Sequence, residues 1–313
     1  MLGRTANGLY WMSRYIERSE NMARLVDAGL RMALTRTENT AEEWSSVVTS
    51  AGAEFAFADA HGNDLTEATV SDFLLRDRNN PSSVMSAMET ARMNARMVRT
   101  ALTRDTWESI NEGWMSLKRL LSNPIDERDL PAVLDAVKRD ASLIRGSFFS
   151  TMLRNEIFDF CQIGTFVERA DNTARILDVK YYVLLPSVSW VGSSLDNYQW
   201  ESILRSVSAH RSYRWIYEAE YRPTNIADFL ILNGRMPRSL AFCYRMISEH
   251  LNFLGEAYGV RHSSHETVVQ TMAKLKVGSI KDIIDSGLHE FLGGFINDNG
   301  RLGEQVAQNY RFY

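Results

Sequence analysis

One stretch of thirteen residues occurs twice in this chain of 313 residues, and it constrains the fold more than any other feature. The first copy spans residues 15–27 and the second spans residues 166–178, an offset of 151 residues. Glu, Arg, Asn, Ala, Arg and Asp recur at the same places in both copies, and several apolar positions between them also match. A match at a fixed offset indicates an internal duplication, which builds a chain from two similar halves.

Both copies are predicted to be helices that lie in the interior of the protein. No Gly or Pro interrupts either copy, and apolar residues recur at helical spacing. At about 100° per residue, Glu17, Asn21 and Arg24 fall on one narrow polar stripe. Tyr10 and Arg14 lie on the same stripe, whereas apolar residues cover most of the remaining circumference. Such a helix is expected to be buried, so its stripe needs water, a partner helix or a ligand.

The repeat continues beyond the second copy at an offset of 156 residues. The shift from 151 to 156 requires one insertion of five residues, which we place between Asp178 and Trp200, where residues 186–194 have the Pro, Ser and Gly content of a loop. Three segments match at the new offset, and they begin at Trp44 and Trp200, at Asp72 and Asp228, and at Pro81 and Pro237.

These patterns predict an all-α fold, a multi-helix bundle from an internal duplication with pseudo-two-fold symmetry. Residues 1–150 form the first helical half and residues 151–313 form the second. Neither half is expected to be stable alone, because its central helix is apolar on nearly all sides. We therefore expect one fused core.

Composition argues against several functions. The chain has 35 basic and 39 acidic residues and a net charge of −4, whereas nucleic-acid binding usually requires a strongly basic domain. Its two cysteines are too few for the usual four-cysteine zinc site, and no Gly-rich phosphate loop is present, so we expect no metal and no cofactor. The longest apolar stretch, residues 181–185, is too short to span a membrane, and no signal peptide is evident, so a cytoplasmic location is expected.

The repeated motifs form a candidate polar site with two open interpretations. As a ligand site, its guanidinium groups bind a carboxylate or phosphate, and its carboxylates bind an amine or act as a base. As a structural clasp, Glu17 pairs with Arg169, and Glu168 pairs with Arg18 across the two-fold axis. The clasp is favoured, because ion-pair networks often connect buried helices without catalysis. The candidate residues are Glu17, Arg18, Asn21, Arg24, Glu168, Arg169, Asn172 and Arg175.

A second candidate site consists of residues that suit an anion near a helix start. Asn80-Pro81 predicts a helix with Asn80 as its N-cap, and helix N-termini bind anions. The favoured alternative is that the serines only cap helices and that the arginines are solvated. The candidate anion-binding residues are Ser82, Ser83, Arg92, Arg96, Arg238 and Ser239.

The chain resembles the bacterial alpha-E domain family, which is named for its helical content and its Glu-Arg motif. The resemblance begins in Met1–Arg18 and includes Asn80–Ser83, residues 91–99, the second motif at residues 168–169 and residues 237–239, so it covers nearly the whole chain. One departure is residue 93, a methionine where the family tends to have Glu. That departure puts any role for an acid at this position in doubt.

The resemblance implies partners rather than an activity. Genes of the family typically lie beside those of a circularly permuted ATP-grasp protein and a transglutaminase-like protein, which implies a system that makes or trims a peptide or amide-linked product. We therefore predict a helical accessory, scaffold or substrate-presenting protein of an ATP-grasp peptide or amide ligase system. The alternative is an enzyme that acts on an amide or acyl-phosphate through the paired Glu-Arg motifs. A peptide or acyl-phosphate ligand is compatible with both, and assembly into a homo-oligomer stays open.

Overall fold

The computed structural model describes residues 1–34, 40–182, 193–218 and 221–313, and every regular element among them is a helix. The all-α prediction is confirmed. Most of the loop predicted at residues 186–194 lies outside the described residues. Across the parts of the chain that the structure describes, no helix is long and apolar enough to cross a membrane.

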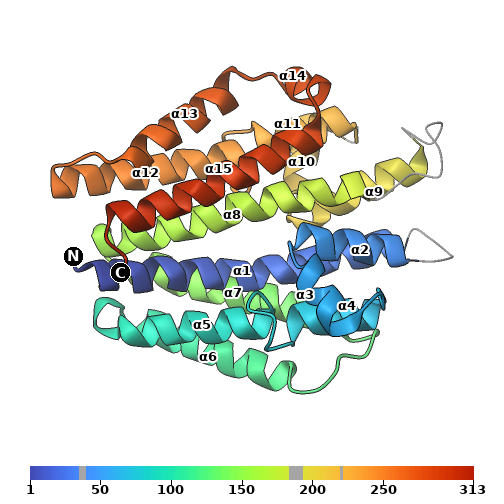
Figure 1. Cartoon of the computed structure of the whole chain (residues 1–313), viewed down its shortest axis with the longest axis horizontal. Coiled ribbons are helices and arrows are strands. Elements are labelled where there is room, and N and C mark those ends of the chain that lie inside the picture. Colours follow the sequence, from blue (N-terminus) through green and yellow to red (C-terminus); the bar gives the residue numbers. More distant parts are fainter. Residues whose placement is uncertain (35–39, 183–192, 219–220) are drawn as a thin grey trace.

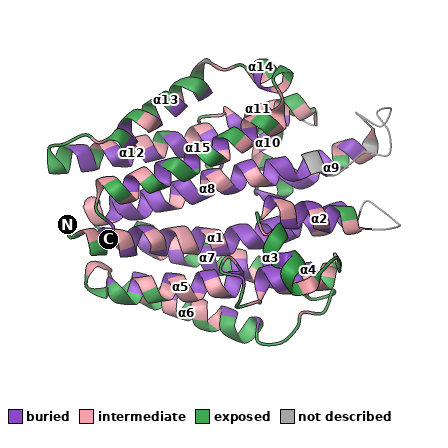
Figure 2. Ribbon diagram, viewed as in Figure 1, coloured by how far each residue is buried: buried purple, intermediate pink, exposed green. Residues whose placement is uncertain are grey.

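Two long helices form the centre of the molecule. Helix α1 (Gly3–Ala33) and helix α8 (Glu156–Tyr182) lie side by side between the other helices (Figure 1). Both are buried along most of their length (Figure 2), as their nearly continuous apolar surface predicts. A Cβ added at Gly164 of α8 would lie 2.4 Å from the carbonyl oxygen of Tyr10. The two backbones therefore touch at this glycine.

Each central helix is covered by three long helices of its own. On one side, α5 and α7 contact α1, and α6 lies against both of them; on the other side, α12 and α15 contact α8, and α13 lies against both (Figure 1). This gives the two sides the same arrangement. The helices are α5 (Val84–Met97), α6 (Arg104–Leu120), α7 (Leu130–Thr151), α12 (Leu240–Tyr258), α13 (Ser263–Val277) and α15 (Leu288–Asn309).

Shorter helices gather around the end of the central pair that lies opposite the two chain termini (Figure 1). Helices α2 and α9 each contact both α1 and α8, so they connect the two sides there (Figure 1). The short helices are α2 (Ala41–Ser50), α3 (Glu54–His61), α4 (Glu67–Leu75), α9 (Ser194–Ser206), α10 (His210–Tyr217), α11 (Pro223–Ile231) and α14 (Ile280–Asp285), and a 3-10 turn η1 (Arg99–Ala101) follows α5.

Matched positions of the sequence repeat make matched contacts. Arg24 of α1 donates from Nη1 to the carbonyl oxygen of Ser206 at 2.6 Å. Its counterpart Arg175 of α8 donates from Nη1 to the carbonyl oxygen of Ser50 at 3.1 Å. The arginines are 151 residues apart and the serines 156, which are the two offsets seen in the sequence. An approximate two-fold relation predicts such contacts; a gene duplication as its origin stays a prediction.

One predicted helix start was wrong. Helix α5 begins at Val84, and its N-cap is Ser83, whose side chain accepts a hydrogen bond from the Ser86 amide. Asn80 instead accepts from the Ser82 amide at 3.0 Å through Oδ1, in a turn before the helix. An Asn before Pro suits both arrangements, because its side chain binds the backbone two residues on in turns as well as at N-caps.

Candidate functional site

The two Glu-Arg motifs bind each other where α1 and α8 meet. Arg169 donates to Glu17 from Nε at 2.9 Å and from Nη2 at 3.0 Å. Arg18 donates to Glu168 from Nε at 2.5 Å and from Nη2 at 3.0 Å. Each carboxylate thus accepts two hydrogen bonds from one arginine of the other copy of the motif. This bidentate pairing is strong and geometrically specific. The reciprocal clasp that the sequence suggested is present.

The remaining residues of the candidate polar site lie along the same contact. Asn21 donates from Nδ2 to the carbonyl oxygen of Glu168 at 3.3 Å, and Asn172 donates to that of Asn21 at 3.5 Å. Arg24 and Arg175 each pair with an acid one turn earlier on their own helix, Glu20 and Asp171. The structure therefore brings all eight predicted residues into one continuous polar layer.

Sequence reasoning missed two arginines that complete this layer. Arg145 reaches from α7 and donates from Nη1 to Glu17 at 3.2 Å and also to Glu20. Arg14 donates from Nε to Glu168 at 2.7 Å. Arg14 had a usable signal, because it lies on the polar stripe of α1, one turn before Arg18. Arg145 had none, since only the packing of α7 on α1 brings it there.

The predicted anion-binding residues do not form one site. Ser83 caps α5, and Arg92 lies nine residues later, which is about 13 Å along a helix. Arg92 donates to Asn111 and stacks on a tryptophan of α6. Arg238 instead joins the polar layer: it donates to Glu17 at 3.1 Å and to Glu20 at 2.8 Å. Ser239 caps α12, and Arg96 is exposed.

The layer around Glu17 and Glu20 has more positive than negative charge. Two carboxylates there contact four guanidinium groups, so the local excess is two positive charges. Burial lowers the pKa of Arg238 to about 10, and its neighbour Arg24 contributes to this shift. An anion close to this group would therefore reduce an electrostatic cost that the protein alone leaves in place. The four arginines are Arg24, Arg145, Arg169 and Arg238.

Both glutamates of the motif are held in their ionised form. Burial alone raises the pKa of Glu17, but Arg169, Arg238 and Arg145 outweigh it and lower the pKa to about 2. Burial likewise opposes ionisation of Glu168, and Arg18 and Arg14 lower its pKa to about 2. A carboxylate with so low a pKa is a weak base near neutral pH, so neither glutamate suits general-base catalysis.

These pKa shifts predict acid sensitivity. Each glutamate has an ordinary pKa of 4.5 in the unfolded chain and about 2 in the fold. A pKa that is lower in the fold than in the unfolded chain means that the ionised carboxylate stabilises the fold above pH 4.5. Each group contributes about 3 kcal/mol to the free energy of unfolding, and this contribution is lost as the pH falls toward 2. Urea unfolding at stepwise lower pH measures the loss. In Glu17→Gln the slope between pH 5 and 2 should be smaller, and equal slopes in both proteins would contradict the assignment.

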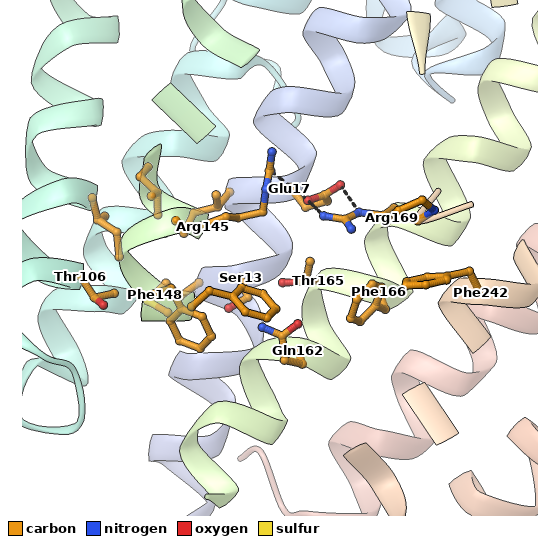
Figure 3. A pocket seen from close by; sticks show the side chains of 17 residues that line it. Ser13, Glu17, Thr106, Arg145, Phe148, Gln162, Thr165, Phe166, Arg169 and Phe242 are labelled. Carbon is orange, nitrogen blue, oxygen red and sulfur yellow. Dashed lines mark hydrogen bonds and ion pairs between the residues drawn. The ribbon is translucent and has the colours of Figure 1, made fainter. Parts of the chain in front are cut away.

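A cavity of about 400 Å³ opens beside Glu17 between the helices α1, α6, α7, α8 and α12. Its wall is largely apolar and includes four phenylalanines, and Figure 3 shows Arg145, Glu17 and Arg169 together at one end of it. Gln162 also lines it and is 2% exposed, and its Oε1 has no hydrogen-bond partner among the described residues. The size lies within the usual range of small-molecule pockets. The four phenylalanines are Phe148, Phe149, Phe166 and Phe242.

An all-α domain whose two central helices exchange Glu-Arg pairs defines the class of this protein. A family model described as "Alpha-E: A predicted alpha-helical domain with a conserved ER motif" matches residues 1–311. The chain therefore belongs to the Alpha-E family. Neither the curated proteins nor the solved structures contain a match to the chain. Among the described residues, no group of His, Cys, Asp and Glu is arranged to hold a metal ion.

Proposed function

We propose that this protein binds an acidic, partly apolar substrate and presents it to an ATP-grasp peptide or amide ligase. The observation that carries the proposal is that Arg145 and Arg169 line one end of a largely apolar cavity. Both belong to the layer in which guanidinium groups outnumber carboxylates by two. A peptide carboxylate or an acyl-phosphate has the matching chemistry, because guanidinium groups bind both in a bidentate manner.

The cavity supports this ligand class at both ends. Arg145 is the most exposed of the arginines that contact Glu17, with 23% of its side chain accessible, so it is the one best placed to turn toward a ligand. Phe148 and Phe166 also line the cavity and provide an apolar surface for the body of the ligand (Figure 3). The ring of Phe166 lies against the Arg169 guanidinium, 5.2 Å from its carbon to the ring centroid, so the apolar wall begins directly beside the charges.

The ATP-grasp partner is proposed from the family resemblance. An ATP-grasp ligase activates a carboxylate as an acyl-phosphate and joins it to an amine, so a protein that holds an acidic substrate complements it. The clasp supports a binding role over the enzyme alternative, because both motif glutamates pair with arginines and are weakly basic. In this arrangement the present protein recognises the substrate, and the ligase carries out the chemistry.

Ligand binding is tested with two compounds that differ only in charge. N-acetylphenylalanine has a carboxylate, and N-acetylphenylalaninamide is its neutral counterpart. We expect the acid to bind at least tenfold more tightly by calorimetry, about 1.4 kcal/mol, and Arg145→Gln to remove this preference. Arg104→Gln removes an arginine whose side chain is 85% exposed and serves as the control. Equal binding of acid and amide to the wild type would refute the site.

Partnership needs a separate measurement. The protein and the ATP-grasp ligase are expressed together, and we expect them to co-purify and the ligase rate to rise when this protein is added. If two independently expressed proteins neither associate nor affect each other's activity, the proposed partnership is wrong, whatever the outcome of the ligand titration.

A further inference from the structure

A second cavity, of about 150 Å³, lies against Glu168 and Asp171. These two acids are the repeat counterparts of Glu17 and Glu20, each 151 residues further along the chain. This cavity shares neither Glu17 nor Arg145 with the larger cavity, so a ligand here is independent of the acidic substrate proposed there.

The two halves of the clasp differ at one oxygen atom. Oε1 of Glu17 accepts two hydrogen bonds, from Arg169 Nε at 2.9 Å and from Arg238 Nη1 at 3.1 Å. Oε1 of Glu168 accepts one among the described residues, from Arg18 Nε at 2.5 Å. A carboxylate oxygen has two lone pairs, so Oε1 of Glu168 has capacity for one more donor. The unused position corresponds to the one that Arg238 fills in the other half.

Ser82 stands where the other half has Arg238. The two residues are 156 residues apart, and each is followed by a serine that caps a helix: Ser83 accepts from the backbone three residues on, and so does Ser239. The local backbone is thus matched, but the side chain at residue 82 is short, and Ser82 lines the cavity. The repeat therefore relates this cavity to the space that the Arg238 guanidinium fills in the other half.

Two buried amide oxygens at this cavity have no partner. Asn21 and Asn172 both line it, they are 1% and 2% exposed, and the Oδ1 atom of each has no hydrogen-bond partner among the described residues. Their Nδ2 atoms donate to backbone carbonyls, which fixes the orientation of both amides. Buried polar atoms are normally hydrogen-bonded, so these oxygens and Oε1 of Glu168 indicate a ligand that donates hydrogen bonds.

We propose that this cavity binds the guanidinium group of a small ligand. The group donates to Glu168 and Asp171, as Arg238 donates to Glu17 and Glu20 at 3.1 and 2.8 Å. Three arginines already pair with Glu168 and Asp171, so the bound group brings the local excess to two positive charges, the same excess that the other half has with Arg238 in place. The volume suffices, since an engineered cavity of about 150 Å³ holds benzene, which is larger than a guanidinium group. A primary ammonium has the same charge without the planar fork, and it is expected to bind more weakly.

Three probes with the same tail test the site: butylguanidinium, butylammonium and butylurea, which is the neutral isostere. We expect calorimetry to show one saturable site for butylguanidinium, binding at least tenfold weaker for butylammonium and none for butylurea. At ten times its Kd, butylguanidinium should raise the melting temperature by about 2 °C. No saturable binding below about 10 mM, or equal affinity for the urea, would overturn the proposal.

Matched variants locate the site. Ser82→Arg supplies the missing side chain, so we expect at least tenfold weaker binding of butylguanidinium and a higher melting temperature. Asp171→Asn, at a residue whose side chain is 20% exposed, should weaken binding at least tenfold even if Ser82→Arg fails to fold. Asn123→Arg adds the same charge in an exposed loop and should bind as the wild type does. Unchanged affinity in Asp171→Asn, or in a folded Ser82→Arg, would overturn the assignment.

Discussion

Replacing Glu17 by Gln is expected to lower the free energy of unfolding by about 3–5 kcal/mol. Glu17 is 1% exposed, and it accepts hydrogen bonds from Arg169, Arg238 and Arg145. Without its charge, the surrounding guanidinium groups remain buried and their excess charge rises from two to three. Urea unfolding at pH 7, followed by circular dichroism, measures the loss.

Two further variants make the Glu17 result interpretable. Glu168→Gln should lose a comparable amount, because two arginines donate three hydrogen bonds to this acid. Glu108→Gln removes one partner of a surface pair with side chains 85% and 48% exposed, and should change stability by less than about 1 kcal/mol. If Glu17→Gln kept the wild-type stability but abolished the output of the ligase system, the enzyme alternative would be favoured instead.

Gly164→Ala is expected to destabilise the protein by about 3 kcal/mol, although alanine is intrinsically better in a helix by about 1 kcal/mol. The added Cβ would lie 2.4 Å from the carbonyl oxygen of Tyr10, and a backbone atom cannot move aside as a flexible side chain can. The central helices must separate, which also lengthens the clasp between them. Thermal unfolding of the variant measures the effect.

Gly300→Ala is the control for this variant: it makes the same substitution in another helix, and it is expected to stabilise the protein rather than destabilise it. Gly300 lies within α15, it is exposed, and a Cβ there meets nothing within 4 Å. This variant should therefore gain about 0.5–1 kcal/mol. If both glycine variants shifted stability in the same direction, the close contact at Gly164 would not be the cause of its effect.

The central part of the fold was predictable because its information lies within one short pattern. Helices α1 and α8 are apolar on most sides, which predicts burial, and each repeats one acid beside one arginine at the same spacing. A reciprocal pairing satisfies both motifs when two such helices are in contact, and the sequence favoured it over a ligand site. The pairs of Glu17 with Arg169 and of Glu168 with Arg18 follow from that reasoning and are present.

The smaller cavity was not predictable, because it depends on a side chain that is missing from one half. The sequence offered Ser82 only as a candidate for anion binding, and its place at a cavity between the acids is recognised only once Arg238 is seen to fill the matched position. Arg145 lies on a helix with no repeat of the motif, so only tertiary packing brings it to Glu17. Local sequence also misassigned Asn80, whose side chain makes a turn rather than the helix cap.

The clasp has a consequence for how the polypeptide acquires its structure during synthesis. Glu17 leaves the ribosome 128, 152 and 221 residues before the arginines that neutralise it. Until those arginines emerge, the acids of α1 have no partners with which they could be buried, and the apolar faces of the helix remain exposed to water. Folding of α1 is thus deferred until Arg238 has been synthesised, and until then the N-terminal half is the part of the chain that most needs protection by a chaperone.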